Sequence, residues 1–268
     1  MDSIKRAVEL ARTARLAPEA GRFAGSIPQV GLSEAKVREV RLDTVHLEAN
    51  RIVAHGGNLD QSVRYYDMLR TQVLQEMEKR NWQFLAVTSP TPGCGKTVTA
   101  CNLAMSIARR PDGCVLLVDL DLRKPTVGSY LGLRNEPGII SVLEGQSALP
   151  TAIVQAIVGR DSLLVLPGST PLARSSEWMA SQTMAMLLET IKRDFRSHTV
   201  IFDLPPMLLG DDVVSILPRM DAVLLVAAVG NSTVADIKEC QKHLQRTPVV
   251  RVLVNKVEQA AEGFYGYY

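Results

Sequence analysis

The pattern of apolar and polar positions changes near residue 60. Beyond it, short apolar runs alternate with stretches in which apolar residues recur every three or four positions, as in helices that pack one face on a core. The apolar runs, each as long as a buried strand, are 84–89, 114–120, 162–168, 199–204, 222–229 and 249–255. Helical spacing is found over 59–80, 97–110, 149–158, 176–194, 211–217 and 232–246. Wholly apolar strands separated by helices predict an α/β fold, with a mostly parallel sheet covered by helices on both faces.

Residues 1–60 predict an extension rather than a second core. Apolar positions recur at helical spacing over 3–16 among basic residues, which favours a short exposed or docking helix. Residues 17–35 are rich in Pro, Gly, Ala and Ser and are typical of a linker, while the pattern over 37–58 is mixed. We therefore expect an N-terminal helix and linker, followed by one catalytic domain over 61–268.

The composition narrows the classes of function. A net charge of +2 over 268 residues gives no indication of a nucleic-acid partner. The four cysteines lack the close pairs of a zinc site and are typical of reduced thiols in a cytoplasmic protein. No apolar stretch reaches the roughly 18 residues of a membrane span, and the N-terminus lacks the apolar core of a secretory signal. We expect a cytoplasmic protein that reaches a membrane only through a partner.

A phosphate-binding loop joins the strand at 84–89 to the helix at 97–110. The run "TSPTPGCGKT" ends in Gly-Lys-Thr, and in such a loop the backbone N–H groups and the helix N-terminus bind phosphate oxygens. Lys96 is expected to reach the β- and γ-phosphates, and the hydroxyl of Thr97 to ligate Mg²⁺. The residues expected to contact the nucleotide are Pro92, Gly93, Cys94, Gly95, Lys96, Thr97 and Val98. The loop predicts a bound nucleoside triphosphate without naming the reaction.

Three aspartates follow predicted strands. Asp119 and Asp121 end one strand and Asp203 ends another, so all three should share the crevice at the carboxyl ends of the strands. Clustered carboxylates favour a cation, and Mg²⁺ takes one or two carboxylates together with phosphate oxygens. Asp121, the more exposed of its pair, is also a candidate to accept a proton from an attacking hydroxyl. Arg123 and the following lysine either steady the phosphate charge or form a solvated basic turn, and both readings stay open.

The C-terminus holds a cluster of tyrosines. Three of the chain's six tyrosines lie in its last four positions, and the residues are Tyr265, Tyr267 and Tyr268. The thirteen residues 256–268 can extend at most about 40 Å from the last strand, far enough to reach a neighbouring subunit. The cluster predicts phosphate acceptors delivered in trans, or else an aromatic patch that packs on the domain or self-associates. Asn255, at the end of that strand, is a candidate for contact with adenine.

Over about residues 60–268 the chain resembles the bacterial tyrosine kinases of polysaccharide co-polymerase systems. The resemblance rests on the loop "TSPTPGCGKT", on "VDLDLRKP" (118–125), on "IFDLPP" (201–206) and on the C-terminal tyrosines. It implies a P-loop NTPase fold that uses ATP and Mg²⁺ to phosphorylate its own tyrosine cluster between subunits, commonly in a ring. It also implies control of exopolysaccharide synthesis and export at the inner membrane, through a membrane-spanning chain-length regulator on a separate chain. The nucleotide, magnesium and catalytic roles then fall to Lys96, Thr97, Asp119, Asp121 and Asp203.

Two features of the sequence depart from the pattern of that family. Its members often carry Glu-x-x-Arg-x-x-Arg as a subunit contact before the first strand, whereas this chain has Arg64, Asp67 and Arg70 at the corresponding places. The exchanged signs put a standard ring in doubt. Cys94 is also unusual in the loop, and beside Lys96 it suggests a reactive thiol and inhibition by oxidation.

Two other functions compete with a tyrosine kinase. Partition and septum-positioning ATPases share the expected fold, but they usually carry a second lysine where this chain has Thr91. The alternative from a different class is a nucleotide-gated assembly subunit of the export machinery with little kinase activity. The tyrosine tail and the intact lysine and aspartates favour the kinase.

Overall fold

The computed structural model describes residues 37–53, 60–133, 137–168 and 170–257. The helix expected at 3–16, the linker at 17–35 and the three C-terminal tyrosines lie outside these residues. No helix within the described ranges is long and apolar enough to cross a bilayer.

One eight-stranded sheet forms the centre of the molecule, in the order β1-β4-β5-β3-β6-β2-β7-β8. All neighbouring strands are parallel except β4 and β5, which are antiparallel. The strands are β1 (Arg38–Arg41), β2 (Phe84–Thr88), β3 (Val115–Asp119), β4 (Val154–Val158), β5 (Asp161–Leu166), β6 (Thr199–Asp203), β7 (Ala222–Ala228) and β8 (Val249–Asn255). The six strands expected from the apolar runs are all present, which confirms the mostly parallel α/β fold.

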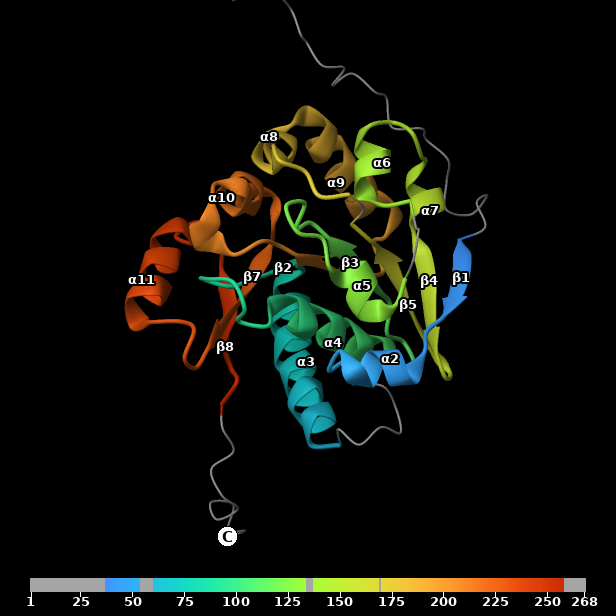
Figure 1. Cartoon of the computed structure of the whole chain (residues 1–268), viewed down its shortest axis with the longest axis horizontal. Coiled ribbons are helices and arrows are strands. Elements are labelled where there is room, and N and C mark those ends of the chain that lie inside the picture. Colours follow the sequence, from blue (N-terminus) through green and yellow to red (C-terminus); the bar gives the residue numbers. More distant parts are fainter. Residues whose placement is uncertain (1–36, 54–59, 134–136, 169, 258–268) are drawn as a thin grey trace, which may run out of the picture.

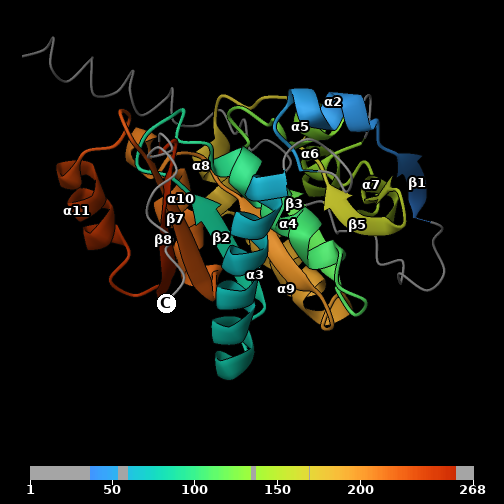
Figure 2. The same cartoon turned by 90° about the horizontal axis from the view of Figure 1, so that it is seen from below.

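Helices cover both faces of this sheet (Figures 1 and 2). One face packs on α2 (Thr44–Ala49), α3 (Asp60–Arg80), α4 (Lys96–Ala108) and α5 (Val127–Leu131). The other packs on α6 (Ile139–Leu143), α7 (Leu149–Ala152), α8 (Ser175–Ala180), α9 (Gln182–Asp194), the short helices η1 (Met207–Leu209) and η2 (Leu217–Arg219), α10 (Asp212–Ile216) and α11 (Val234–His243). Successive residues of β2 enter opposite cores: Phe84 packs in one and Leu85 in the other. The central strands therefore have to be apolar along their whole length.

Part of the expected N-terminal extension belongs to this sheet. Strand β1 pairs with β4 at the edge, and α2 packs on α5. The N–H of Val53 donates to Oδ1 of Asn102 on α4 at 2.7 Å, and the side-chain amide of Asn102 donates to the carbonyl of Arg51 at 2.9 Å. The segment with the mixed pattern over 37–58 thus contains an edge strand of four residues. That strand is too short for its apolar positions to show a strand period.

The prediction of a single helix over 149–158 is wrong. The structure has a short helix, α7, followed by β4, which forms a hairpin with β5. Along β4, buried residues alternate with half-buried ones, which is the period of a strand. Gly159, with φ of 59°, takes a left-handed conformation in the turn that follows. The helix expected over 176–194 is also divided, because the hydroxyl of Ser181 accepts the N–H of Met184 and begins α9 anew.

Candidate functional site

The carboxyl ends of β3, β6 and β2 lie side by side and carry the expected site. These three strands are neighbours in the sheet, and Asp119 is aligned with Asp203 across β3 and β6. The phosphate-binding loop follows β2 and leads into α4, which begins at Lys96. Helix α4 therefore points its N-terminus at the same edge, where its free N–H groups favour an anion.

The phosphate-binding loop is shaped by two glycines. Gly93 and Gly95 have φ of 78° and 90°, a left-handed backbone that favours glycine. A Cβ at Gly95 would also collide with the side-chain amide of Asn255, which donates to the carbonyl of Cys94 at 2.9 Å. Asn255, the adenine candidate, thus lies directly on the loop.

Thr91 ties this loop to its own subunit. Its hydroxyl donates to the carbonyl of Asn231, in the turn after β7, at 3.0 Å. The side-chain amide of Asn231 lies 3.4 Å from the carbonyl of Pro92. The position that holds a second lysine in the partition ATPases therefore makes a contact within the chain here.

Lys96 and two of the aspartates form one buried cluster. The Nζ of Lys96 lies 2.7 Å from Oδ2 of Asp121 and 3.5 Å from Oδ1 of Asp203. The hydroxyl of Thr97 donates to Oδ2 of Asp203 at 2.7 Å. Asp203 is fully buried and Asp121 is 5% exposed, so water screens these charges little.

Asp119 has a different set of contacts from the other two carboxylates. Its Oδ2 accepts the N–H groups of Thr126 and Val127, each at 2.9 Å, and its Oδ1 accepts the N–H of Asp121 at 3.2 Å. Both oxygens thus hold the loop that follows β3. In this geometry Asp119 shapes the site, while Asp203 and Asp121 face the lysine.

Burial and mutual repulsion perturb the ionisation of the cluster. Burial, then the nearby Asp203, raises the pKa of Asp119 to about 8. Burial also raises the pKa of Asp203, although Lys96 and Thr97 oppose that shift. Burial alone would lower the pKa of Lys96, but the carboxylates of Asp203 and Asp121 outweigh it and raise this pKa. Three carboxylates lie near one lysine, so full ionisation would leave negative charge uncompensated, and the raised pKa values of Asp119 and Asp203 reflect this.

These residues fit a magnesium ion that arrives with phosphate. The Oδ1 of Asp203 is buried without a hydrogen-bond partner among the described residues, and the hydroxyl of Thr97 lies beside the other oxygen of Asp203. Carboxylate and hydroxyl oxygens are the ligands that Mg²⁺ prefers. Within the described chain no three carboxylate, histidine or cysteine side chains are grouped closely enough to hold a metal ion by themselves. Phosphate oxygens and water would have to complete the coordination.

Arg123 is held by two residues that the sequence reasoning missed. Its Nη2 lies 2.6 Å from Oδ2 of Asp212, and its Nε donates to the hydroxyl of Ser175 at 3.0 Å. Of the two sequence interpretations, this anchored geometry favours a placed arginine over a solvated turn. Asp212 follows the Asp-x-Pro-Pro motif by a few residues and starts a short helix, which was the only available signal.

The burial of Cys94 contradicts the prediction of a reactive thiol, because oxidation would require an accessible one. Cys94 is 1% exposed, and its Sγ lies 3.2 Å from the hydroxyl of Ser232. A reactive cysteine needs both a thiolate and access to solvent, and burial removes the second. Cys94 therefore packs the loop against the turn after β7.

Asp67, expected at a subunit contact, is used within the chain. Its Oδ1 accepts hydrogen bonds from Ser106 at 2.6 Å, from Arg109 at 2.8 Å and from Arg70 at 3.1 Å. Hydrogen bonds and cations outweigh the effect of its partial burial and lower the pKa of Asp67. These contacts join α3 to α4, whereas Arg64 is exposed on the outer side of α3.

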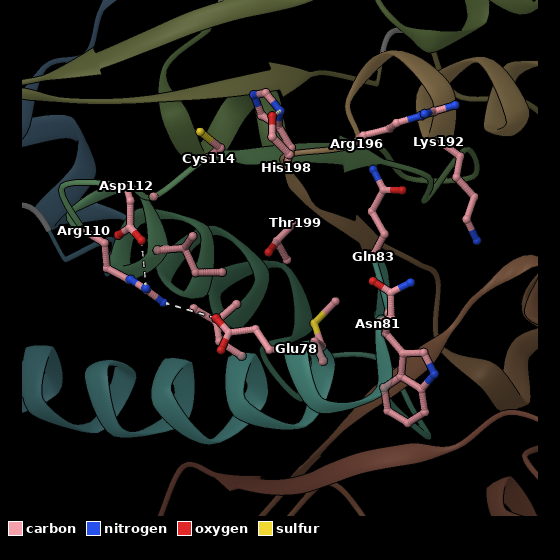
Figure 3. A pocket seen from close by; sticks show the side chains of 16 residues that line it. Glu78, Asn81, Gln83, Arg110, Asp112, Cys114, Lys192, Arg196, His198 and Thr199 are labelled. Atoms are coloured by element: carbon pink, nitrogen blue, oxygen red, sulfur yellow. Dashed lines mark hydrogen bonds and ion pairs between the residues drawn. The ribbon is translucent and has the colours of Figure 1, made fainter.

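A polar cavity of about 590 Å³ lies at the opposite end of the sheet (Figure 3). It is lined by Cys114, Thr199 and Gln83, which lie at the amino ends of β3, β6 and β2. On its rim Arg110 pairs with Asp112 at 3.2 Å. None of the expected site residues lines it, so the cavity is separate from the phosphate-binding edge.

Comparison with known proteins agrees with this geometry. Residues 85–264 match the model of the CobQ/CobB/MinD/ParA nucleotide binding domain. The tyrosine-protein kinase YwqD of Bacillus subtilis is 30% identical over 205 residues, which cover 76% of this chain and 84% of YwqD. The chain belongs to the bacterial tyrosine kinase family. This membership confirms the resemblance seen in the sequence motifs.

Longer relatives and a solved structure give the same family. The putative tyrosine-protein kinase EpsB of Ralstonia nicotianae is 30% identical over 240 residues, which cover 89% of this chain and 31% of EpsB. The chain thus spans about a third of that relative. The kinase domain of the Escherichia coli tyrosine kinase ETK superposes with a TM-score of 0.66 at 25% identity, over 88% of this chain and 96% of that domain.

Proposed function

We propose that this protein is an ATP-dependent protein-tyrosine kinase that phosphorylates its own C-terminal tyrosines. The observation that carries the proposal is the buried cluster of Lys96, Thr97, Asp121 and Asp203 at the N-terminus of α4. Kinship with proteins named as tyrosine kinases supports the reaction. The acceptors are Tyr265, Tyr267 and Tyr268, which follow β8 in the sequence.

The residues of the edge divide the chemistry among them. The loop from Pro92 to Val98 holds the phosphates of ATP through backbone N–H groups, and Lys96 leaves its carboxylate partners to bind phosphate oxygens. Thr97 and Asp203 would hold Mg²⁺, and the ion would supply positive charge to neutralise the phosphates. Asp121 accepts the proton of the attacking tyrosine hydroxyl, which joins the γ-phosphorus as the bond to ADP breaks. Asp119 orients the loop that carries Asp121. Asn255, which lies on the phosphate-binding loop, contacts the adenine.

The proposal includes a membrane partner and a place in polysaccharide export. The domain would act in the cytoplasm and reach the inner membrane through a membrane-spanning chain-length regulator on a separate chain, as the family resemblance implies. Transfer between subunits would require a homo-oligomer, such as a ring. The Asp67 contacts lie within one chain, so its contact surface would differ from the usual motif.

Intact mass spectrometry tests the reaction directly. Purified protein is incubated with ATP and Mg²⁺ beside a variant in which Tyr265, Tyr267 and Tyr268 are all phenylalanine. We expect phosphate additions on the wild-type chain and none on the triple variant. ATP turnover without phosphate on protein would refute the kinase and favour an ATPase of the partition type.

A mixing experiment tests delivery in trans. Lys96→Met protein, which keeps its tyrosines, is mixed with a chain that ends at Gly263, which keeps its site. Phosphate on the Lys96→Met chain indicates transfer between subunits. If that chain stays unmodified while wild-type protein is phosphorylated, transfer occurs in cis.

A further inference from the structure

Asp212 is a buried carboxylate for which the proposed reaction has no role. It begins α10 and is 2% exposed. Its Oδ2 lies 2.6 Å from Nη2 of Arg123, while its Oδ1 is buried without a hydrogen-bond partner among the described residues. A buried charge with one compensating partner is costly, so its presence calls for a reason other than stability.

The guanidinium of Arg123 is fixed from two sides. Nε donates to Ser175, which is 1% exposed and starts α8, and Nη2 pairs with Asp212. Gly210 leaves room for this arrangement, because a Cβ there would come within 2.8 Å of Nη2. Two segments from distant parts of the chain therefore hold this one side chain.

The remaining nitrogen of Arg123 is available to a ligand. No described residue accepts a hydrogen bond from Nη1, and the side chain is 41% exposed. Arg123 follows Asp121 by two residues, and Asp121 contacts Lys96 at 2.7 Å. A rigid arginine with free N–H donors, two residues along the chain from a carboxylate of this cluster, suits a phosphoryl oxygen, since its planar fork loses little freedom on binding.

We propose that Asp212, with Ser175, is a positioning residue that aims Arg123 at the transferred phosphoryl group. The inference rests on the proposed kinase function and assigns Asp212 a part in it. Asp212 acts only through Arg123, so removing its charge frees the guanidinium and misplaces a donor needed during transfer. A lysine at position 123 cannot contact Asp212 and Ser175 as a fork and would not replace the arginine.

Steady-state kinetics of autophosphorylation test this role. We expect Asp212→Asn to lower kcat about 10- to 100-fold, with KM for ATP within about threefold, because a donor misplaced by about 1 Å can cost that much. Ser175→Ala removes only the second tie and should lower kcat a few-fold (roughly three- to tenfold). This milder variant keeps the test open if Asp212→Asn folds poorly.

A double variant separates positioning from plain structural support. Arg123→Ala leaves the Asp212 charge uncompensated and should lower the melting temperature, and adding Asp212→Asn should restore it. The kcat of Arg123→Ala should then stay low and change by less than about twofold on adding Asp212→Asn. An Asp212→Asn protein with wild-type kcat, or a double variant whose kcat recovers with its stability, would overturn the inference. Absence of phosphate transfer by the wild-type chain would instead refute the kinase function itself.

Discussion

Two clusters of charged residues in this protein differ in how well their carboxylates are compensated. On the α3–α4 interface, Asp67 is surrounded by Arg70, Arg109 and Ser106, and its pKa is lowered. At the carboxyl edge of the sheet, Asp121 and Asp203 contact Lys96, and the pKa values of Asp119 and Asp203 are raised. In the first cluster arginines compensate the carboxylate, whereas in the second the carboxylates outnumber the lysine and full ionisation would leave buried negative charge uncompensated.

The difference separates a stabilising cluster from a functional one. Buried charge without compensation lowers stability, so a folded chain retains it where a ligand supplies the missing charge. We propose that at the carboxyl edge this ligand is Mg²⁺ with a nucleotide, for which Thr97 and Asp203 offer oxygen ligands. Substitutions in the two clusters should therefore change activity and stability in different directions.

Loss of the lysine should have the largest effect. Lys96→Met removes a cation that we propose binds the phosphates during transfer, and we expect autophosphorylation to fall at least about 10²- to 10³-fold. The matched control is Lys238→Met, since Lys238 is exposed on α11. Phosphate incorporation per minute, measured by mass spectrometry, gives the comparison. Equal rates of phosphate incorporation in both variants would show that Lys96 has no role in the reaction.

Asp203→Asn should separate function from stability. The substitution abolishes transfer but relieves repulsion among buried carboxylates, so we expect the nucleotide-free protein to gain about 1–2 kcal/mol in free energy of unfolding. Asp221→Asn is the contrasting variant. Asp221 accepts the N–H groups of Gln83 and Phe84 at the other end of the sheet, so its change should cost stability. Urea unfolding measures both, and a loss of stability in Asp203→Asn would contradict the account.

Asp67→Asn should lower stability with little direct effect on chemistry. The carboxylate joins two helices but is partly exposed, so we expect a loss of about 1 kcal/mol. Asp112→Asn, on an exposed pair with Arg110, should change stability by less than about 0.5 kcal/mol. Similar values for the two variants would mean that the Asp67 cluster contributes no more than a surface ion pair.

The smallest expected effect is a pH dependence. Because the folded-state pKa of Asp67 is lowered, its stabilising contribution is fully present above the pKa of the unfolded chain, near 4, and is lost as pH falls through the folded-state value. The difference in unfolding free energy between wild type and Asp67→Asn should therefore shrink below about pH 4. Taking the difference cancels the titration of the other carboxylates. If this difference in unfolding free energy instead grows on acidification, the direction assigned to the pKa shift of Asp67 is wrong.

Much of the fold followed from the sequence, because the central strands are buried on both sides. All six apolar runs became strands, whereas β1 and β4 were missed. Both lie towards one edge of the sheet, where half-exposed positions weaken the signal. Over 149–158 the apolar spacing suited a helix as well as a strand, and only pairing with β5 decides between them.

The site was only partly predictable for a similar reason. Lys96, Thr97 and the strand-end aspartates follow from local motifs, and the sheet order brings them together. Asp212 and Ser175 come from distant segments, and no local pattern connects them to Arg123. The burial of Cys94 also depends on a turn far away in the sequence.

The Mg²⁺ dependence of ATP binding tests the central claim most directly. Calorimetry measures the affinity for ATP with and without Mg²⁺, in wild-type protein and in Asp203→Asn. We predict that Mg²⁺ tightens binding to the wild type by about tenfold or more, and that this gain is largely lost in Asp203→Asn. An equal gain in both proteins would show that the carboxylates at the carboxyl edge do not serve the metal and its nucleotide.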